Sequence, residues 1–261
     1  MKLGDKCAIV VGGGSGMGRA TAELLRREGM AVAILDLPGS QGPAVAEAIE
    51  AQFMACDITD EVGTEAAIAA AVEALGALHV AVNVAGGSAP PRRLIDARGP
   101  YPLAEYRRVV ELNLIASFNL DRLEAWHMSR NAPEDGERGV IINTASIAAY
   151  GGQVGGIHYS SSKAGVAGLS LGVARDLAPY GIRCMAIAPG MFETGLIAAM
   201  PPELRASLLG EAVFPRRPGQ PAEFALMVKA IAENPMLNGD TVRLDGGTRR
   251  AIHDDLEDRL F

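Results

Sequence analysis

The segment that decides the fold is Val11-Gly12-Gly13-Gly14-Ser15-Gly16-Met17-Gly18, between the apolar run Cys7–Val11 and the amphipathic stretch Met17–Arg27. Glycines allow a tight turn in which backbone N–H groups and a helix N-terminus can bind a pyrophosphate. The spacing is G-x-x-x-G-x-G, because residue 17 is Met. Glycine-rich turns also occur in ordinary loops, but the strand–turn–helix context favours a dinucleotide site. Its expected contacts are Gly12, Ser15, Gly16, Met17 and Gly18.

Outward from this segment, short β-branched runs alternate with longer amphipathic stretches. The expected strands are Cys7–Val11, Ala31–Asp36, Phe53–Asp57, Leu78–Val84, Val140–Thr144, Arg183–Ala188 and Thr241–Leu244. The expected helices are Met17–Arg27, Pro43–Ala51, Asp60–Leu75, Leu103–Arg130, Ser160–Leu177 and Pro221–Ala232. Strands that are apolar on both faces suit a parallel sheet covered by helices on each side. We therefore predict a single-domain, doubly wound (Rossmann-type) α/β fold with a seven-stranded parallel sheet.

The predicted domain spans residues 1–248, followed by a charged tail at 249–261. Residues 86–102 and 131–139 are expected to be loops, and the first is long enough to suggest a function. Residues 191–214 are rich in large apolar side chains. They predict either a lid over an apolar substrate or an ordinary packed helix.

Composition excludes several classes of protein. The 261 residues are 49% hydrophobic and carry a formal net charge of −7, which disfavours disorder and nucleic-acid binding. The three cysteines, Cys7, Cys56 and Cys184, lie in or beside strand-like runs and are expected to be buried thiols. No His/Cys/Asp cluster has metal-ligand spacing, so no metal is expected. With no evident signal peptide or membrane span, we expect a cytoplasmic protein.

Asp36 strengthens the dinucleotide hypothesis. It ends the second expected strand, about 20 residues beyond the glycine segment, where an acidic side chain binds an adenosine ribose. A carboxylate there repels a 2′-phosphate, and neither Leu37 nor the glycine segment supplies a cation. NAD is therefore preferred over NADP, although a strand-end aspartate can also simply form a turn.

A second group of residues predicts proton chemistry. Tyr159 and Lys163 are four residues apart, on one face of an expected helix. A nearby positive charge lowers the pKa of a tyrosine, which makes Tyr159 a candidate general acid/base. Ser146 follows an expected strand at the edge of the sheet where ligands bind, and its hydroxyl could hold a carbonyl oxygen. A surface ion pair and a turn serine are the alternatives.

With these residues assembled, the sequence resembles the short-chain dehydrogenase/reductase family from about residue 2 to 247. That resemblance implies a catalytic tetrad of Asn113, Ser146, Tyr159 and Lys163, in which asparagine supports a water relay. It also implies cofactor contacts by Tyr159 and Lys163 themselves, and by Leu37, Asp57, Ile58, Ala85, Gly86, Pro189, Gly190, Phe192 and Thr194. Val11 and Val84 stand where the family usually has Thr and Asn.

Within the family, the sequence is most similar to type 2 3-hydroxyacyl-CoA dehydrogenases, which also oxidise hydroxysteroids. The matching stretches include Gly139–Ser146, Gly152–Gly155 and Ala174–Pro179. The resemblance implies that Gln153 contacts the substrate oxygen and that the protein is a homotetramer. We expect an NAD-dependent dehydrogenase of 3-hydroxyacyl-CoA. A dehydrogenase of hydroxysteroids or other lipophilic alcohols, or a non-catalytic dinucleotide sensor, is the alternative.

Two weaker expectations concern the surface. Arg92, Arg93, Arg216 and Arg217 could bind coenzyme A phosphates, although some are expected to be solvated. Gly165, Gly168 and Gly172 lie on one face of the Tyr159 helix and suggest a close approach by the sheet or a partner subunit. His158 is given no role, because it points away from Tyr159.

Overall fold

A computed structural model of the chain describes residues 1–193 and 212–249. Its centre is a seven-stranded parallel sheet of β1 (Cys7–Val11), β2 (Ala31–Asp36), β3 (Gln52–Ala55), β4 (Val80–Asn83), β7 (Gly139–Thr144), β8 (Ile182–Pro189) and β9 (Thr241–Leu244). The strand order is β3-β2-β1-β4-β7-β8-β9, so β2 and β3 are added on one side of β1, and β4 and the later strands on the other. The predicted doubly wound fold is confirmed, with strand ends displaced by at most a few residues.

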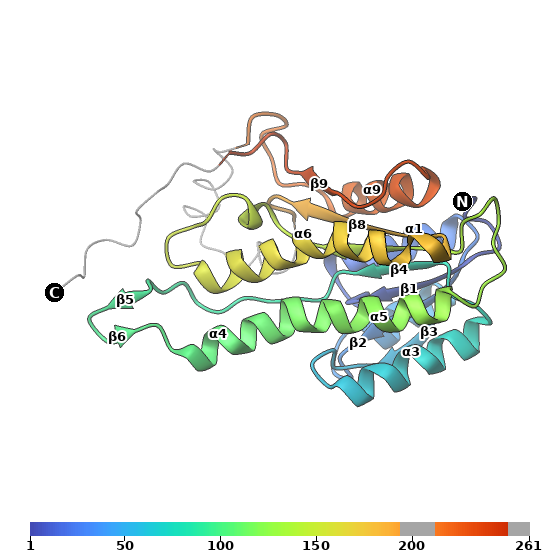
Figure 1. The fold of residues 1–261 in the computed structure, drawn as a ribbon, viewed down its shortest axis with the longest axis horizontal. Helices are drawn as coiled ribbons and strands as arrows, with labels where there is room; N and C mark the ends of the chain where they lie inside the picture. Colours follow the sequence, from blue (N-terminus) through green and yellow to red (C-terminus); the bar gives the residue numbers. More distant parts are fainter. Residues whose placement is uncertain (194–211, 250–261) are drawn as a thin grey trace.

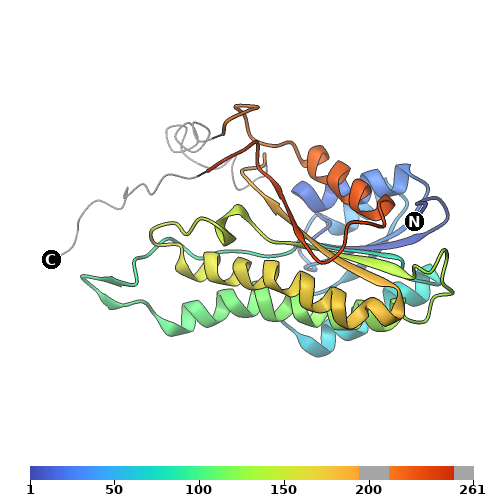
Figure 2. The ribbon, with the colours of Figure 1, turned by 45° about the horizontal axis from the view of Figure 1, so that its top comes forward.

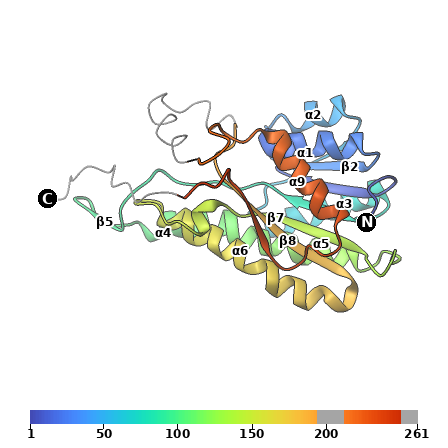
Figure 3. The same cartoon turned by 90° about the horizontal axis from the view of Figure 1, so that it is seen from above.

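Helices cover both faces of this sheet (Figures 1 and 3). One face packs against α1 (Gly16–Arg27), α2 (Gly42–Ala48) and α9 (Pro221–Glu233); the other packs against α3 (Glu61–Leu75), α5 (Ala116–Met128) and α6 (Ile157–Leu177). Successive strand side chains alternate between the faces. In β1, Val10 belongs to the first core and Ile9 to the second. This alternation explains why the strands are apolar throughout.

The expected helix 103–130 is interrupted. It consists of α4 (Leu103–Val110), a π-helical segment (Glu111–Ile115) and α5, which run alongside α6 (Figure 2). Apolar periodicity looks continuous across such a junction, because a π turn inserts only one residue. The second expected helix is also shorter than predicted and ends at Ala48.

The long loop after β4 contains a hairpin that the sequence did not predict. Strands β5 (Ile95–Asp96) and β6 (Gly99–Pro100) pair antiparallel at the end of an arm beyond α4 (Figure 1). Two-residue strands are too short to produce an alternating pattern.

The glycines of α6 behave differently from one another. A side chain at Gly165 would collide with Leu114, whereas Gly168 and Gly172 have nothing within 4 Å of the position a Cβ would take. Within the described chain, a close approach therefore exists only at Gly165, and it comes from the π-helical segment and not from the sheet. Of the expected lid, residues 194–211 lie outside the described part, as does the tail beyond Arg249.

Candidate active site

The glycine segment closes over the ends of β1 and β4. Gly12 and Gly16 adopt left-handed φ values of 80° and 51°, which glycine adopts without strain. A side chain on Gly18 would collide with the carbonyl oxygen of Gly12, and one on Gly12 would collide with Ala85. Because α1 begins at Gly16, its first N–H groups and its positive end face outward from this turn. The segment therefore fits a pyrophosphate.

Asp36 lies against the same segment. Its carboxylate accepts hydrogen bonds from the backbone N–H of Gly14 at 2.8 Å and of Leu37 at 2.8 Å. An ionised carboxylate offers about four acceptor positions, so two remain for the hydroxyls of a ribose. Asp36 thus occupies the place that the sequence predicts.

Asp57 and Ile58 follow β3, the strand next to β2 in the sheet. Asp57 accepts from the backbone and hydroxyl of Thr59 at 3.0 and 2.7 Å, and these hydrogen bonds lower its pKa. The Ile58 side chain is buried. Both residues lie at the carboxyl end of β3, where the adenine end of a dinucleotide is expected.

Lys163 is the buried cation of the site. Its Nζ donates to the Thr144 carbonyl at 2.7 Å and lies 5.9 Å from the centre of the Tyr159 ring. Burial lowers the pKa of this lysine from 10.5 to about 8. An ammonium group has three donors. With one used by Thr144, the lysine fits a ribose that needs two hydroxyl partners, and it also presents positive charge to Tyr159.

Ser146 comes directly after β7 and is buried. Its Oγ accepts a hydrogen bond from the Ala148 N–H at 3.1 Å and so caps a short 3-10 helix, Ile147–Ala149. Accepting this bond leaves the hydroxyl proton to be donated. The arrangement fits a serine that holds a carbonyl oxygen.

Asn113 lies within the π-helical segment, where the extra residue turns its side chain toward the loop after β4. Its Nδ2 donates to the Gly87 carbonyl at 2.7 Å, and its Oδ1 accepts from the Gly87 N–H at 3.0 Å. A side chain on Gly86 would meet Asn113 Oδ1 at 2.7 Å and Lys163 Nζ at 3.2 Å. The side chain of Asn113 thus holds the loop, and its backbone carbonyl accepts from Ser117 at 2.7 Å.

Other predicted residues are placed less directly. Pro189 ends β8 and Gly190 packs on Asp245, but the Phe192 ring turns into the core against Phe224. Gln153 is exposed in the loop before α6, and Thr194 lies outside the described residues.

The arginines proposed for coenzyme A are partly engaged elsewhere. Arg92 pairs with Asp96 at 3.0 Å and Arg217 with Glu223 at 2.6 Å. Their ion pairs make them poorer phosphate ligands than the sequence suggested. The three cysteines are free and buried, as predicted.

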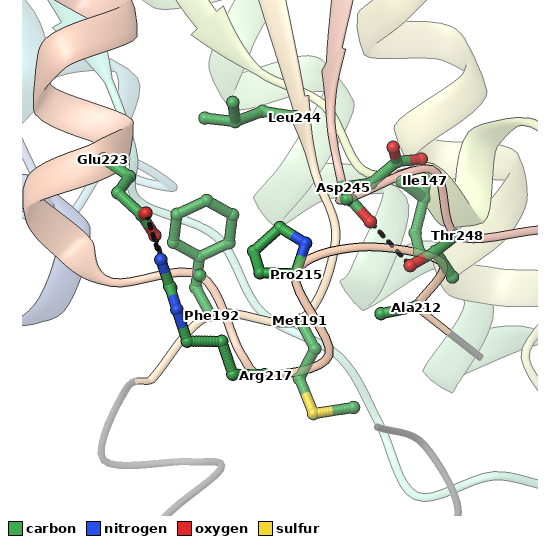
Figure 4. Close-up of a pocket in the computed structure, with 12 residues that line it drawn as sticks. Ile147, Met191, Phe192, Ala212, Pro215, Arg217, Glu223, Leu244, Asp245 and Thr248 are labelled. Atoms are coloured by element: carbon green, nitrogen blue, oxygen red, sulfur yellow. Dashed lines mark hydrogen bonds and ion pairs between the residues drawn. The ribbon is translucent and has the colours of Figure 1, made fainter. Parts of the chain in front are cut away.

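A cavity of about 160 Å³ is lined in part by Ile147, the residue after Ser146 (Figure 4). Ile147, Met191, Phe192, Pro215 and Leu244 give it an apolar lining, and the Arg217–Glu223 ion pair lies on one side. It is bounded by the turn after β8 and by the chain after β9. Its position and lining suit an apolar group attached to a carbonyl held at Ser146.

Two features near the site were not found from the sequence. His158 is buried against the loop after β4. Asp121 and Glu124 are buried on α5, where they accept hydrogen bonds from Asn143 and Asn83. Charged residues on an amphipathic helix normally indicate its solvent face, so the pattern gave no signal for these two.

Across the described ranges, no helix is long and apolar enough to span a membrane, and no group of three or more His, Cys, Asp or Glu could hold a metal ion.

The fold and the site together define an oxidoreductase that binds a dinucleotide, and a family comparison agrees. The model for short chain dehydrogenases matches residues 6–204. The chain therefore belongs to the short-chain dehydrogenase/reductase family, whose members are enzymes that use NAD or NADP. This membership is inconsistent with the sensor hypothesis.

Within this family, the chain is similar to enzymes of one type. The 3-hydroxyacyl-CoA dehydrogenase type-2 of Homo sapiens is 46% identical over 246 residues, which cover 93% of this chain and 94% of the relative. The protein of that name from Drosophila melanogaster is 44% identical, covering 93% and 96%. The chain is thus similar to the type-2 3-hydroxyacyl-CoA dehydrogenases, as the sequence predicts.

Solved structures show the same likeness. The crystal structure of 3-hydroxyacyl-CoA dehydrogenase type-2 from Mycobacterium avium has a TM-score of 0.90 at 35% identity, covering 97% of this chain and 98% of that one. A 7α-hydroxysteroid dehydrogenase complexed with NADH and 7-oxo glycochenodeoxycholic acid has a TM-score of 0.86 at 31% identity, covering 97% of each chain.

Proposed function

We propose that this enzyme interconverts 3-hydroxyacyl-CoA and 3-oxoacyl-CoA with NAD as its cofactor. The observation that carries the proposal is the buried Lys163 beside the Tyr159 ring, in a chain 46% identical to a 3-hydroxyacyl-CoA dehydrogenase type-2. An apolar cavity lined by Ile147, next to Ser146, supports it. The carboxylate of Asp36 beside the Gly14 N–H supports NAD, because it would repel a 2′-phosphate.

Four side chains have separate roles in the proposed reaction. The glycine segment, Asp36 and Lys163 would hold the nicotinamide cofactor, which would supply the hydride for ketone reduction and accept it in the reverse direction. Ser146 donates a hydrogen bond to the carbonyl oxygen, and Tyr159 transfers its phenolic proton to that oxygen as negative charge develops. The positive charge of Lys163 stabilises the resulting phenolate. Asn113 keeps residues 86–87 in place next to this lysine.

An absorbance assay of NADH tests the proposal, with acetoacetyl-CoA as the ketone. We expect turnover by the wild type, and loss of about 10²–10⁴-fold in Tyr159→Phe, because the variant lacks the proton donor. NADPH should be the poorer donor. Turnover in Tyr159→Phe equal to that of the wild type would contradict the assigned acid, and preference for NADPH would contradict the role of Asp36.

The second candidate substrate is a hydroxysteroid, which the likeness to the 7α-hydroxysteroid dehydrogenase favours. A panel of ketosteroids in the same assay separates the two. Turnover of steroids well above that of acetoacetyl-CoA would replace the thioester proposal and leave the assigned chemistry intact.

A further inference from the structure

His158 joins the helix of the reactive tyrosine to the long loop after β4. The residue is 1% exposed and lies in the first turn of α6. Its Nε2 lies 3.2 Å from both Ser88 Oγ and the Ala89 carbonyl oxygen, and its Nδ1 lies 3.1 Å from the Tyr101 hydroxyl. Its ring also stacks on Tyr101, with centroids 5.5 Å apart. One side chain thus contacts both ends of the segment 88–101.

These contacts account for both ring nitrogens. A neutral imidazole has one donor and one acceptor. The Tyr101 hydroxyl can donate to Nδ1 while Nε2–H donates to the Ala89 carbonyl. Loss of the imidazole would remove a donor from the buried Ala89 carbonyl and an acceptor from the half-buried Tyr101 hydroxyl, and so weaken the hold on both ends of the loop.

The loop is also held at two further points. Asn113 exchanges two hydrogen bonds with Gly87, and the Arg92 N–H donates to the Gly155 carbonyl at 2.9 Å. Gly155 lies two residues beyond Gln153, in the segment between Ser146 and α6. The loop therefore connects the Asn113 side of the site to the segment that carries Gln153.

Successive residues of a helix point about 100° apart. Tyr159 is directed toward Lys163, while His158 is directed toward the loop. The histidine can thus fix the loop without contacting the reacting atoms.

We propose that His158 is a positioning residue that fixes residues 88–101 between Asn113 and the segment that carries Gln153, and that the fixed loop determines affinity for the part of the substrate beyond the ketone. The effect on substrate affinity rests on the function proposed above. The fixing of the loop by His158 does not, and hydrogen exchange measures it separately.

The test compares wild type, His158→Ala, His158→Asn and Tyr101→Phe. In hydrogen-exchange mass spectrometry of the substrate-free protein, His158→Ala should exchange faster at residues 88–101. We expect the KM of His158→Ala for acetoacetyl-CoA to rise about tenfold, because the loss of one or two hydrogen bonds costs about that much. Its kcat should change much less. His158→Asn should recover part of the loss, since its amide can reach the Tyr101 hydroxyl.

Tyr106→Phe is the matched control. Tyr106 lies on α4, and its hydroxyl contacts Ser161 of α6 at 3.1 Å, so this variant removes a comparable contact outside the loop. It should leave both exchange at residues 88–101 and KM unchanged. If His158→Ala fails to fold, Tyr101→Phe and Ser88→Ala test the same contacts from the loop side.

Unchanged exchange at residues 88–101 in the folded variants would overturn the proposal. So would a fall in kcat with constant KM, because that result would assign His158 to the proton transfer of Tyr159. If the wild type does not reduce acetoacetyl-CoA, the proposed function fails alone. The exchange measurement still stands, and the KM comparison is then made with whichever ketone the wild type reduces.

Discussion

At the scale of single residues, Lys163 carries a charge that pH can remove. Because burial lowers its pKa to about 8, the ammonium loses its proton as the pH rises through that value. Binding that depends on the ammonium then weakens. We expect the dissociation constant of NADH, measured by fluorescence, to rise above about pH 8, and to rise less in Lys163→Arg, which stays charged.

Lys163→Met should weaken NADH binding at every pH and lower kcat/KM at pH 7 by at least about 10²-fold, because both the ribose contact and the charge beside Tyr159 are lost. Lys229→Met is the control, since Lys229 of α9 pairs with Glu28 at the C-terminal end of α1. Equal pH dependence in wild type and Lys163→Arg would show that another group controls binding.

At the scale of elements, α5 carries two buried carboxyl groups against β4 and β7. Asp121 accepts from Asn143 at 2.9 and 3.0 Å, and Glu124 accepts from Asn83 at 3.0 Å. Burial raises the pKa of Asp121 to about 7 and, with the charge of Asp121, that of Glu124 to about 8. Both groups therefore hold their protons more tightly in the folded chain than in the unfolded one.

The stability of the folded chain should therefore fall as the pH rises. Carboxyls of the unfolded chain lose their protons near pH 4, so the favourable contribution of these groups is complete below that value and is lost as the pH rises through about 7 and 8. The thermal midpoint of wild type should fall between pH 6 and pH 9 more than that of Asp121→Asn/Glu124→Gln. The difference in unfolding free energy should exceed about 1 kcal/mol. The exposed Asp176→Asn is the control, and an equal fall in all three proteins would refute the assignment.

The sequence predicts elements well where a pattern is long. The apolar runs of β1, β2 and β7 identified the sheet, and the glycine segment with Asp36 predicts the cofactor side of the site. It could not locate what depends on tertiary contacts. The π segment has helical periodicity, β5 and β6 are too short for any periodicity, and His158 becomes a loop contact only when residues 88–101 fold onto α6.

At the scale of the whole molecule, α5 and α6 leave an apolar surface exposed. Phe118 and Trp126 on α5 and Leu171 on α6 are each about half exposed, and the positions that a Cβ would take at Gly168 and Gly172 of α6 are open. A second copy of the chain would cover this surface. We expect a homotetramer by light scattering, and Phe118→Asp should shift it to smaller species because a charge would be buried. A tetramer in both proteins would place the interface elsewhere.

The π-helical turn also constrains the length of the chain. A regular α-helix from 103 to 128 would need one residue fewer, so a one-residue deletion within 111–115 is easily absorbed by the helix itself. It would close the wide turn and change the direction of the side chains within 111–115, while α4 and α5 keep their places. Asn113 would then lose Gly87, while the core beneath α5 would barely change. The extra residue within 111–115 is thus required by the contact between Asn113 and Gly87, and the packing of the fold alone does not require it.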